Sequence, residues 1–107
     1  MTAEEGKAAP PSAPEARRTV TLVNSRGLHA RAAARFVKLA EGFDAQIFVT
    51  RDGETVSGGS IMGLMMLAAA AGCDLLIEAT GAEAEAAVDA LTGLVAAGFE
   101  EDQARDS

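Results

Sequence analysis

The order in which strand-like and helix-like apolar patterns follow one another constrains the fold of this chain more than any other sequence feature. Apolar residues alternate with polar ones in short runs, which predict half-buried strands. They recur at helical spacing in longer runs, which predict amphipathic helices. The runs follow in the order strand, helix, strand, strand, helix, strand, helix, over residues 19–24, 30–41, 45–51, 54–57, 61–71, 75–79 and 84–95.

This order predicts an α+β fold. The Asp-Gly pair at 52–53 is typical of a hairpin turn, so the strands on either side of it are expected to pair antiparallel. The whole pattern, β-α-β-β-α-β-α, predicts an open-faced β-sandwich in which a four-stranded antiparallel sheet carries three helices on one face. In the last strand, Leu75 and Ile77 are expected to face the helices, while Glu78 points outward.

The prolines and the charged residues mark the expected ends of the domain. All three prolines fall in residues 1–18, and this segment is expected to be a disordered N-terminal tail. Residues 19–99 form the predicted domain, and residues 100–107 are expected to be an acidic C-terminal tail. A chain of 107 residues has room for one modest core, and we expect it to be a monomer.

Composition restricts the compartment and the class of partner. The longest apolar run, residues 61–71, is shorter than the roughly 20 residues that cross a bilayer, so no membrane insertion is expected. Cys73 is the single cysteine, and a cytoplasmic location is the simplest expectation. A formal net charge of −7 argues against nucleic-acid binding, which needs a basic face. One histidine and one distant cysteine provide no metal site.

The single histidine lies where a predicted loop passes into a predicted helix, in the string Gly27-Leu28-His29-Ala30-Arg31. A helix N-terminus leaves backbone N–H groups unpaired and carries partial positive charge, so anions bind there. These surroundings favour a phosphoryl group on the imidazole of His29, with a charge-assisted contact from Arg31. The same spacing fits a passive helix cap without chemistry, and spacing alone slightly favours that simpler interpretation. Further cations on or beside this helix are Arg26, Arg35 and Lys38.

A second constellation begins at Ser60, a candidate N-cap before an apolar helical run. The side chains of Ile61, Met62, Met65 and Met66 exceed what one face of a short helix buries, so some of them are expected to face solvent. An exposed Met-rich patch is typical of a surface that docks several partners. Ile61, Met62 and Met65 are the candidates for this surface, with a purely structural role as the alternative. The expected core positions of the helix are Leu64 and Leu67.

Both segments resemble motifs of one known family. Residues 27–37, GLHARAAARFV, resemble the active-site segment of HPr, the histidine-containing phosphocarrier protein of the bacterial phosphotransferase system. Residues 60–67, SIMGLMML, resemble the regulatory-serine segment of the same family. The two motifs stand in the family's order and at its spacing. The resemblance extends over residues 19–99 and implies the HPr-type fold.

The resemblance also implies roles for individual residues. His29 would accept the phosphoryl group on Nδ1, and Arg31 would steady it, without a cofactor. Phospho-enzyme I, charged from phosphoenolpyruvate, would be the donor and an enzyme IIA-type domain the acceptor, which makes the chain a relay rather than an enzyme. Ser60 would be a regulatory site for HPr kinase/phosphorylase, which uses ATP. The family commonly has proline where this chain has Ala32, a replacement that adds a backbone N–H to the first helical turn and makes that turn less rigid.

Two alternatives stay open at this stage. One is a member of the nitrogen-related branch of the system, which signals without sugar transport. The other, from a different class, is a small interaction domain of similar layout in which His29 only caps its helix.

Overall fold

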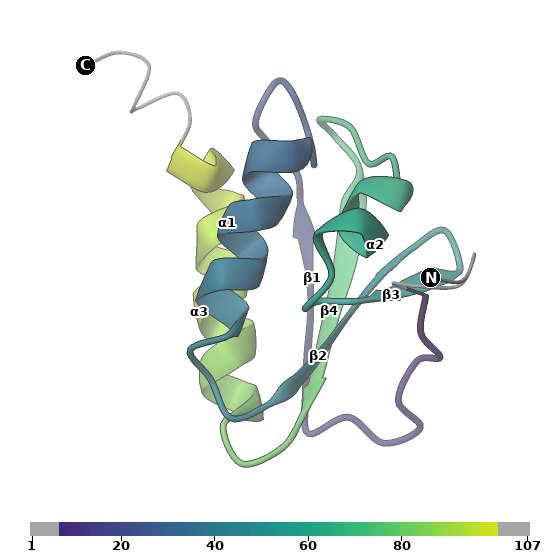
Figure 1. Cartoon of the computed structure of the whole chain (residues 1–107), viewed down its shortest axis with the longest axis vertical. Coiled ribbons are helices and arrows are strands. Elements are labelled where there is room, and N and C mark those ends of the chain that lie inside the picture. The colour runs from purple at the N-terminus through teal and green to yellow at the C-terminus, as the bar shows by residue number, and fades with distance from the viewer. Residues whose placement is uncertain (1–6, 101–107) are drawn as a thin grey trace.

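The elements follow one another in the predicted order in the computed structural model of the chain, which describes residues 7–100 (Figure 1). Four antiparallel strands form one sheet in the order β1-β4-β2-β3. The predicted α+β open-faced sandwich is therefore confirmed. The elements are β1 (Ala16–Thr21), α1 (Ala30–Ala40), β2 (Gln46–Arg51), β3 (Glu54–Ser57), α2 (Ile61–Met66), β4 (Asp74–Thr80), α3 (Ala84–Ala96) and the 3-10 turn η1 (Gly98–Glu100).

The helices cover one face of the sheet, with α1 and α3 side by side in Figure 1 and α2 beside the upper part of α1. The core lies between them, where Phe36 of α1 meets the inward side chains of the central strands, such as Val49 and Ile77. Buried alanines on α1 and α3 leave short side chains at the helix surfaces, which allows close packing. The buried residues of α3 recur at helical spacing, as expected for an amphipathic helix, and they are Ala84, Ala87, Val88, Leu91 and Val95.

The turn between β2 and β3 has the conformation that its sequence predicts. Asp52 and Gly53 adopt φ values of 51° and 81°, both in the left-handed region. A two-residue turn of this kind matches the twist of the flanking strands, which is why Asp-Gly favours it. The tight turn aligns Arg51 opposite Glu54 at the end of the hairpin.

The second helix is shorter than predicted. The apolar run over 61–71 indicated one helix, but α2 ends at Met66 and Ala68 adopts a left-handed φ of 52°. Tertiary hydrogen bonds account for the early end, because the carbonyl groups of Leu67 and Ala69 accept bonds from Arg51 and from the backbone of Leu28. Apolar periodicity does not reveal such long-range partners.

The first strand begins three residues earlier than the predicted domain boundary. The strand expected from residue 19 starts at Ala16, so residues 16–18 belong to the sheet and not to a tail. The preceding chain also contacts the sheet: Lys7 forms a bridge with Val56 on the outer edge of β3, and the Ala8 N–H donates to the Thr55 carbonyl at 3.0 Å. Residue 100 of the predicted C-terminal tail belongs to η1, and residues 1–6 and 101–107 of the two predicted tails lie outside the described residues.

The outward face of β4 holds a buried carboxylate. The register places Glu78 opposite Arg17 of β1 and Phe48 of β2, on the side away from the helices as predicted. The residue is nevertheless only 5% exposed. Its carboxylate lies 3.9 Å from Nε of Arg17, which supplies the opposite charge.

Candidate functional site

His29 is the N-cap residue of α1, as the sequence predicts. Its backbone is extended, with φ −80° and ψ −178°, and its carbonyl accepts a hydrogen bond from Ala33 at 2.9 Å. The half-buried imidazole therefore lies beside the first turn of an 11-residue helix. Backbone N–H groups of a first turn lack intrahelical acceptors, and here Ala32 contributes an N–H that a proline would not. The helix end is suited to an anion attached to the imidazole.

The loop before His29 is held in place by hydrogen bonds that involve buried residues. The side-chain amide of Asn24, a buried residue, donates to the carbonyl of Gly27 at 2.8 Å. The Leu28 N–H donates to the carbonyl of Ala69 at 3.0 Å, which joins this loop to the segment after α2. Gly27 has a φ of 65°, and a Cβ there would lie 2.4 Å from the oxygen of Ala69. The turn before the histidine thus requires glycine for two reasons, its conformation and its close approach to a neighbouring backbone.

The two arginines of α1 have different surroundings. Arg31 lies in the first turn of α1 and is exposed, so its guanidinium can reach an anion at this helix end. Arg35 is half-buried, and its Nη1 donates to the carbonyl of Phe99 in η1. Arg35, one of the further cations expected on this helix, therefore links α1 to the end of the domain. Lys38 is exposed farther along the same helix.

Ser60 is the N-cap of α2, which the sequence also predicts. Its hydroxyl oxygen accepts a hydrogen bond from the N–H of Gly63 at 2.9 Å. The residue is half-buried at the start of a six-residue helix, after the Gly58-Gly59 turn. A helix N-terminus favours a negative charge, so a phosphate added at this position is expected to leave the helix folded.

The apolar surface predicted on α2 is exposed. Ile61, Met62, Met65 and Met66 are 41–56% exposed, which excludes a core position for all four. Leu64 and Leu67, the predicted core positions, are buried instead. This surface, which we call the Met patch, follows directly after Ser60. Flexible apolar side chains exposed together are suited to weak contact with more than one partner.

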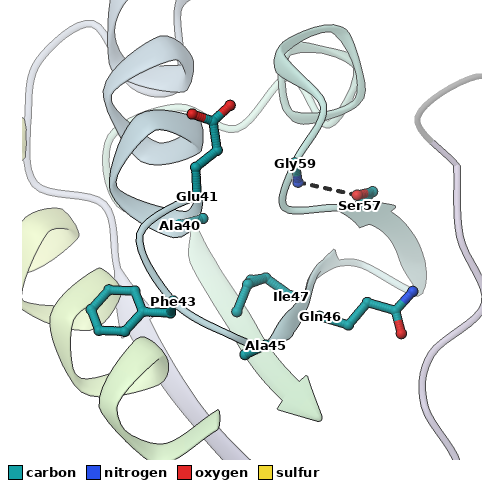
Figure 2. Close-up of a pocket in the computed structure, with 8 residues that line it drawn as sticks. All are labelled: Ala40, Glu41, Phe43, Ala45, Gln46, Ile47, Ser57 and Gly59. Carbon is teal, nitrogen blue, oxygen red and sulfur yellow. Dashed lines mark hydrogen bonds between the residues drawn. The ribbon is translucent and has the colours of Figure 1, made fainter. Parts of the chain in front are cut away.

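A cavity of about 240 Å³ lies at the opposite end of α1 from His29 (Figure 2). Ala40 and Ile47 line it, and the side chains of Glu41 and Gln46 point away from each other rather than toward a common centre. A ligand site needs polar groups that converge, so the cavity adds nothing to the site at His29. Among residues 7–100, no group of three or more His, Cys, Asp or Glu side chains is placed to hold a metal ion. None of the helices in this range is long and apolar enough to span a bilayer.

The family model described as the "PTS HPr component phosphorylation site" matches residues 16–97. The chain belongs to the HPr family of phosphocarrier proteins. It is 44% identical over 84 residues to phosphocarrier protein HPr of Cupriavidus necator, covering 78% of this chain and 94% of that protein. It is 38% identical over 87 residues to phosphocarrier protein NPr of Escherichia coli K12, covering 80% and 97%. The crystal structure of HPr from Thermoanaerobacter tengcongensis is 40% identical with a TM-score of 0.77, covering 80% and 97%.

Membership in the HPr family assigns a general phosphocarrier role to the chain. The sequence predicts His29, Arg31, Ser60 and the exposed residues of α2 as site residues. Sequence reasoning missed the supports of the histidine loop, above all Asn24 and Gly27. The Asn-x-x-Gly spacing was the available signal, since asparagine often bonds to the backbone of a turn that ends in glycine.

Proposed function

We propose that the chain is a phosphoryl relay in which Nδ1 of His29 accepts a phosphoryl group from phospho-enzyme I and passes it to an enzyme IIA-type domain. The position of His29 as N-cap of α1 carries the proposal. In the accepting step, Nδ1 attacks phosphorus in line with the leaving atom of the donor, so one bond to phosphorus forms as the other breaks. First-turn N–H groups and Arg31 stabilise the charge of the transferred group. No cofactor takes part, and the chain performs no turnover of its own.

The Met patch is the proposed docking surface for the relay partners. Ile61, Met62 and Met65 supply exposed apolar area, and exposed Arg31 and Lys38 supply positive charge on the neighbouring helix α1. A small patch favours weak binding with fast exchange, which a carrier that serves several partners needs. We place this exchange in the cytoplasm and expect the chain to act as a monomer.

Ser60 is the proposed regulatory site, phosphorylated by HPr kinase/phosphorylase with ATP. A phosphate there adds a charge of about −1.5 to −2 directly beside the Met patch. Because the hydroxyl already caps α2, the added charge acts mainly by repelling an acidic partner and not by unfolding the helix. Phosphorylation of Ser60 is thus expected to block docking.

The test of the relay is direct. The protein is incubated with phosphoenolpyruvate and enzyme I, and acid-labile phosphate is measured on the wild type and on His29→Ala. Labelling of the wild type alone is the expected result. An unlabelled wild-type chain contradicts the relay and favours an interaction domain in which His29 only caps α1.

A second candidate within the family is the nitrogen-related regulatory branch. Relatives with the name HPr and relatives with the name NPr match the chain at similar identity, 44% and 42% for two of them, so identity does not separate the branches. Purified phospho-protein is therefore offered separately to a sugar-specific enzyme IIA and to a nitrogen-related enzyme IIA. Transfer only to the second assigns the chain to the regulatory branch, without sugar transport.

A further inference from the structure

Arg51 is far from His29 in the sequence but is connected to it through the end of α2. It is the last residue of β2, and its side chain is 30% exposed. Nη1 donates a hydrogen bond to the carbonyl of Leu67 at 3.0 Å, while Nη2 lies 3.7 Å from the exposed carboxylate of Asp52. The guanidinium thus uses one nitrogen to hold the backbone of another element.

The carbonyl that Arg51 holds lies at a point where the chain would otherwise be poorly fixed. Leu67 is the C-cap of the six-residue helix α2, and the last carbonyl groups of a helix lack intrahelical donors. The next residue, Ala68, has a φ of 52°, which is unfavourable for a residue with a Cβ. A charge-assisted bond from an arginine satisfies the free carbonyl and holds this strained turn in one conformation.

The turn then contacts the loop of His29. Ala69 lies two residues beyond Leu67, and its carbonyl accepts the hydrogen bond from the Leu28 N–H at 3.0 Å. The α-carbon of Gly27 packs against the same peptide so closely that no Cβ fits between them. Three consecutive residues, Leu67, Ala68 and Ala69, therefore connect the guanidinium of Arg51 to the residue that precedes His29.

We propose that Arg51 is a positioning residue for phosphoryl transfer, because it fixes the turn after α2 that in turn fixes the backbone before His29. This inference rests on the proposed relay function. It also gives α2 a second role, since the helix that carries the Met patch is attached at its end to the loop of the acceptor. A small misplacement of a reacting group lowers a transfer rate strongly, so loss of Arg51 acts on the rate without removing a group that touches phosphorus.

The experiment compares Arg51→Met, which keeps the length of the side chain but removes the donor, with Arg51→Lys, which restores a donor. Arg18→Met is the control for loss of one positive charge, since Arg18 pairs with Asp89 on the exposed surface. Two quantities are measured for each variant: amide hydrogen exchange at Leu28 by NMR, and the rate of His29 phosphorylation by phospho-enzyme I.

For Arg51→Met we expect faster exchange at Leu28, with exchange in the core of β4 at Ile77 unchanged, and a transfer rate lower by about 10-fold. Arg51→Lys is expected to recover most of both effects, and Arg18→Met to show neither. The proposal is overturned if exchange at Leu28 stays at the wild-type value, or if exchange rises while the transfer rate stays unchanged. Failure of the relay itself shows separately, as a wild-type chain that takes up no phosphate.

Discussion

The N–H of Leu28 and the carbonyl of Ala69 form a hydrogen bond of 3.0 Å that joins the loop before His29 to the turn after α2. Gly27 lies directly beside this bond, and its missing side chain lets the two backbones approach. The loop of the candidate acceptor is therefore attached to the end of the helix that carries the Met patch. The contribution of each of these residues can be measured as a change in the free energy of unfolding or in the rate of phosphoryl transfer.

Gly27→Ala is expected to destabilise the protein more than an ordinary substitution of a left-handed glycine. The left-handed backbone alone costs about 1–2 kcal/mol for a residue with a Cβ. At Gly27 the added Cβ would also meet the Ala69 oxygen at 2.4 Å, and overpacking of this kind costs about 1–3 kcal/mol more. Urea unfolding followed by far-UV circular dichroism measures the loss, since the chain has neither Trp nor Tyr.

Gly53→Ala is the matched control for that measurement. Gly53 has a similar φ of 81°, but a Cβ there would find no atom within 4 Å. Gly53→Ala is therefore expected to lower the unfolding free energy by the conformational cost alone, about 1–2 kcal/mol, without a steric clash. Equal losses of unfolding free energy in the two variants would show that the approach to Ala69 does not matter.

Two substitutions at Ser60 separate its capping role from its regulatory role. Ser60→Ala removes the acceptor for the Gly63 N–H and is expected to lower the unfolding free energy by about 1 kcal/mol. Ser60→Asp retains a capping oxygen and adds charge, so stability is kept while phosphorylation of His29 by phospho-enzyme I slows. An unchanged rate in Ser60→Asp would contradict regulation by blocked docking.

Local patterns were sufficient for the order of elements, the hairpin turn and both N-caps, because these depend on neighbouring residues. The Asp-Gly turn at 52–53 and the cap at Ser60 formed as predicted. The family resemblance added the chemistry of His29, which spacing alone had left ambiguous. Family membership confirmed the general phosphocarrier role that this resemblance implied.

The failures of sequence reasoning share a physical cause, which is dependence on a distant partner. The helix predicted to reach residue 71 ends early because Arg51 and Leu28 bind carbonyl groups of the turn. The start of β1 was missed because the charged residues at 17–18 resemble a solvated segment, although each is paired across the fold. The outward orientation of Glu78 was predicted correctly, but its burial was not foreseen, because the alternating pattern carries no sign of the residues that cover it.

Met62→Ala tests the Met patch as a docking surface. Met62 is 56% exposed, so its truncation is expected to change the unfolding free energy by no more than about 0.5 kcal/mol. Binding to phospho-enzyme I is expected to weaken, which appears as a higher KM with kcat unchanged. Leu64→Ala on the same helix is the contrast. Truncation of this buried side chain is expected to lower the unfolding free energy by about 2–5 kcal/mol. A KM equal to that of the wild type would remove Met62 from the docking surface.

Arg17→Met and Arg18→Met compare a long, partly buried ion pair with a short, exposed one. Arg17 lies 3.9 Å from Glu78, whose side chain is 7% exposed, whereas Arg18 lies 2.8 Å from Asp89, whose side chain is 57% exposed. We expect burial to affect the stability contribution of these two ion pairs more than distance does. Loss of Arg17 leaves the buried carboxylate of Glu78 without its positively charged partner in a place that water hardly reaches. We expect Arg17→Met to cost about 1–3 kcal/mol of unfolding free energy, and Arg18→Met no more than about 0.5 kcal/mol.

The double variant Arg17→Met/Glu78→Gln checks the cause of that loss. If the unpaired buried carboxylate is responsible, removing its charge restores much of the stability that Arg17→Met alone loses, and the two effects are not additive. Urea unfolding of Arg17→Met, of Glu78→Gln and of the double variant gives the coupling energy between Arg17 and Glu78 directly. A double variant whose loss equals the sum of the single losses would mean that Arg17 stabilises the sheet through its packing and not through its charge.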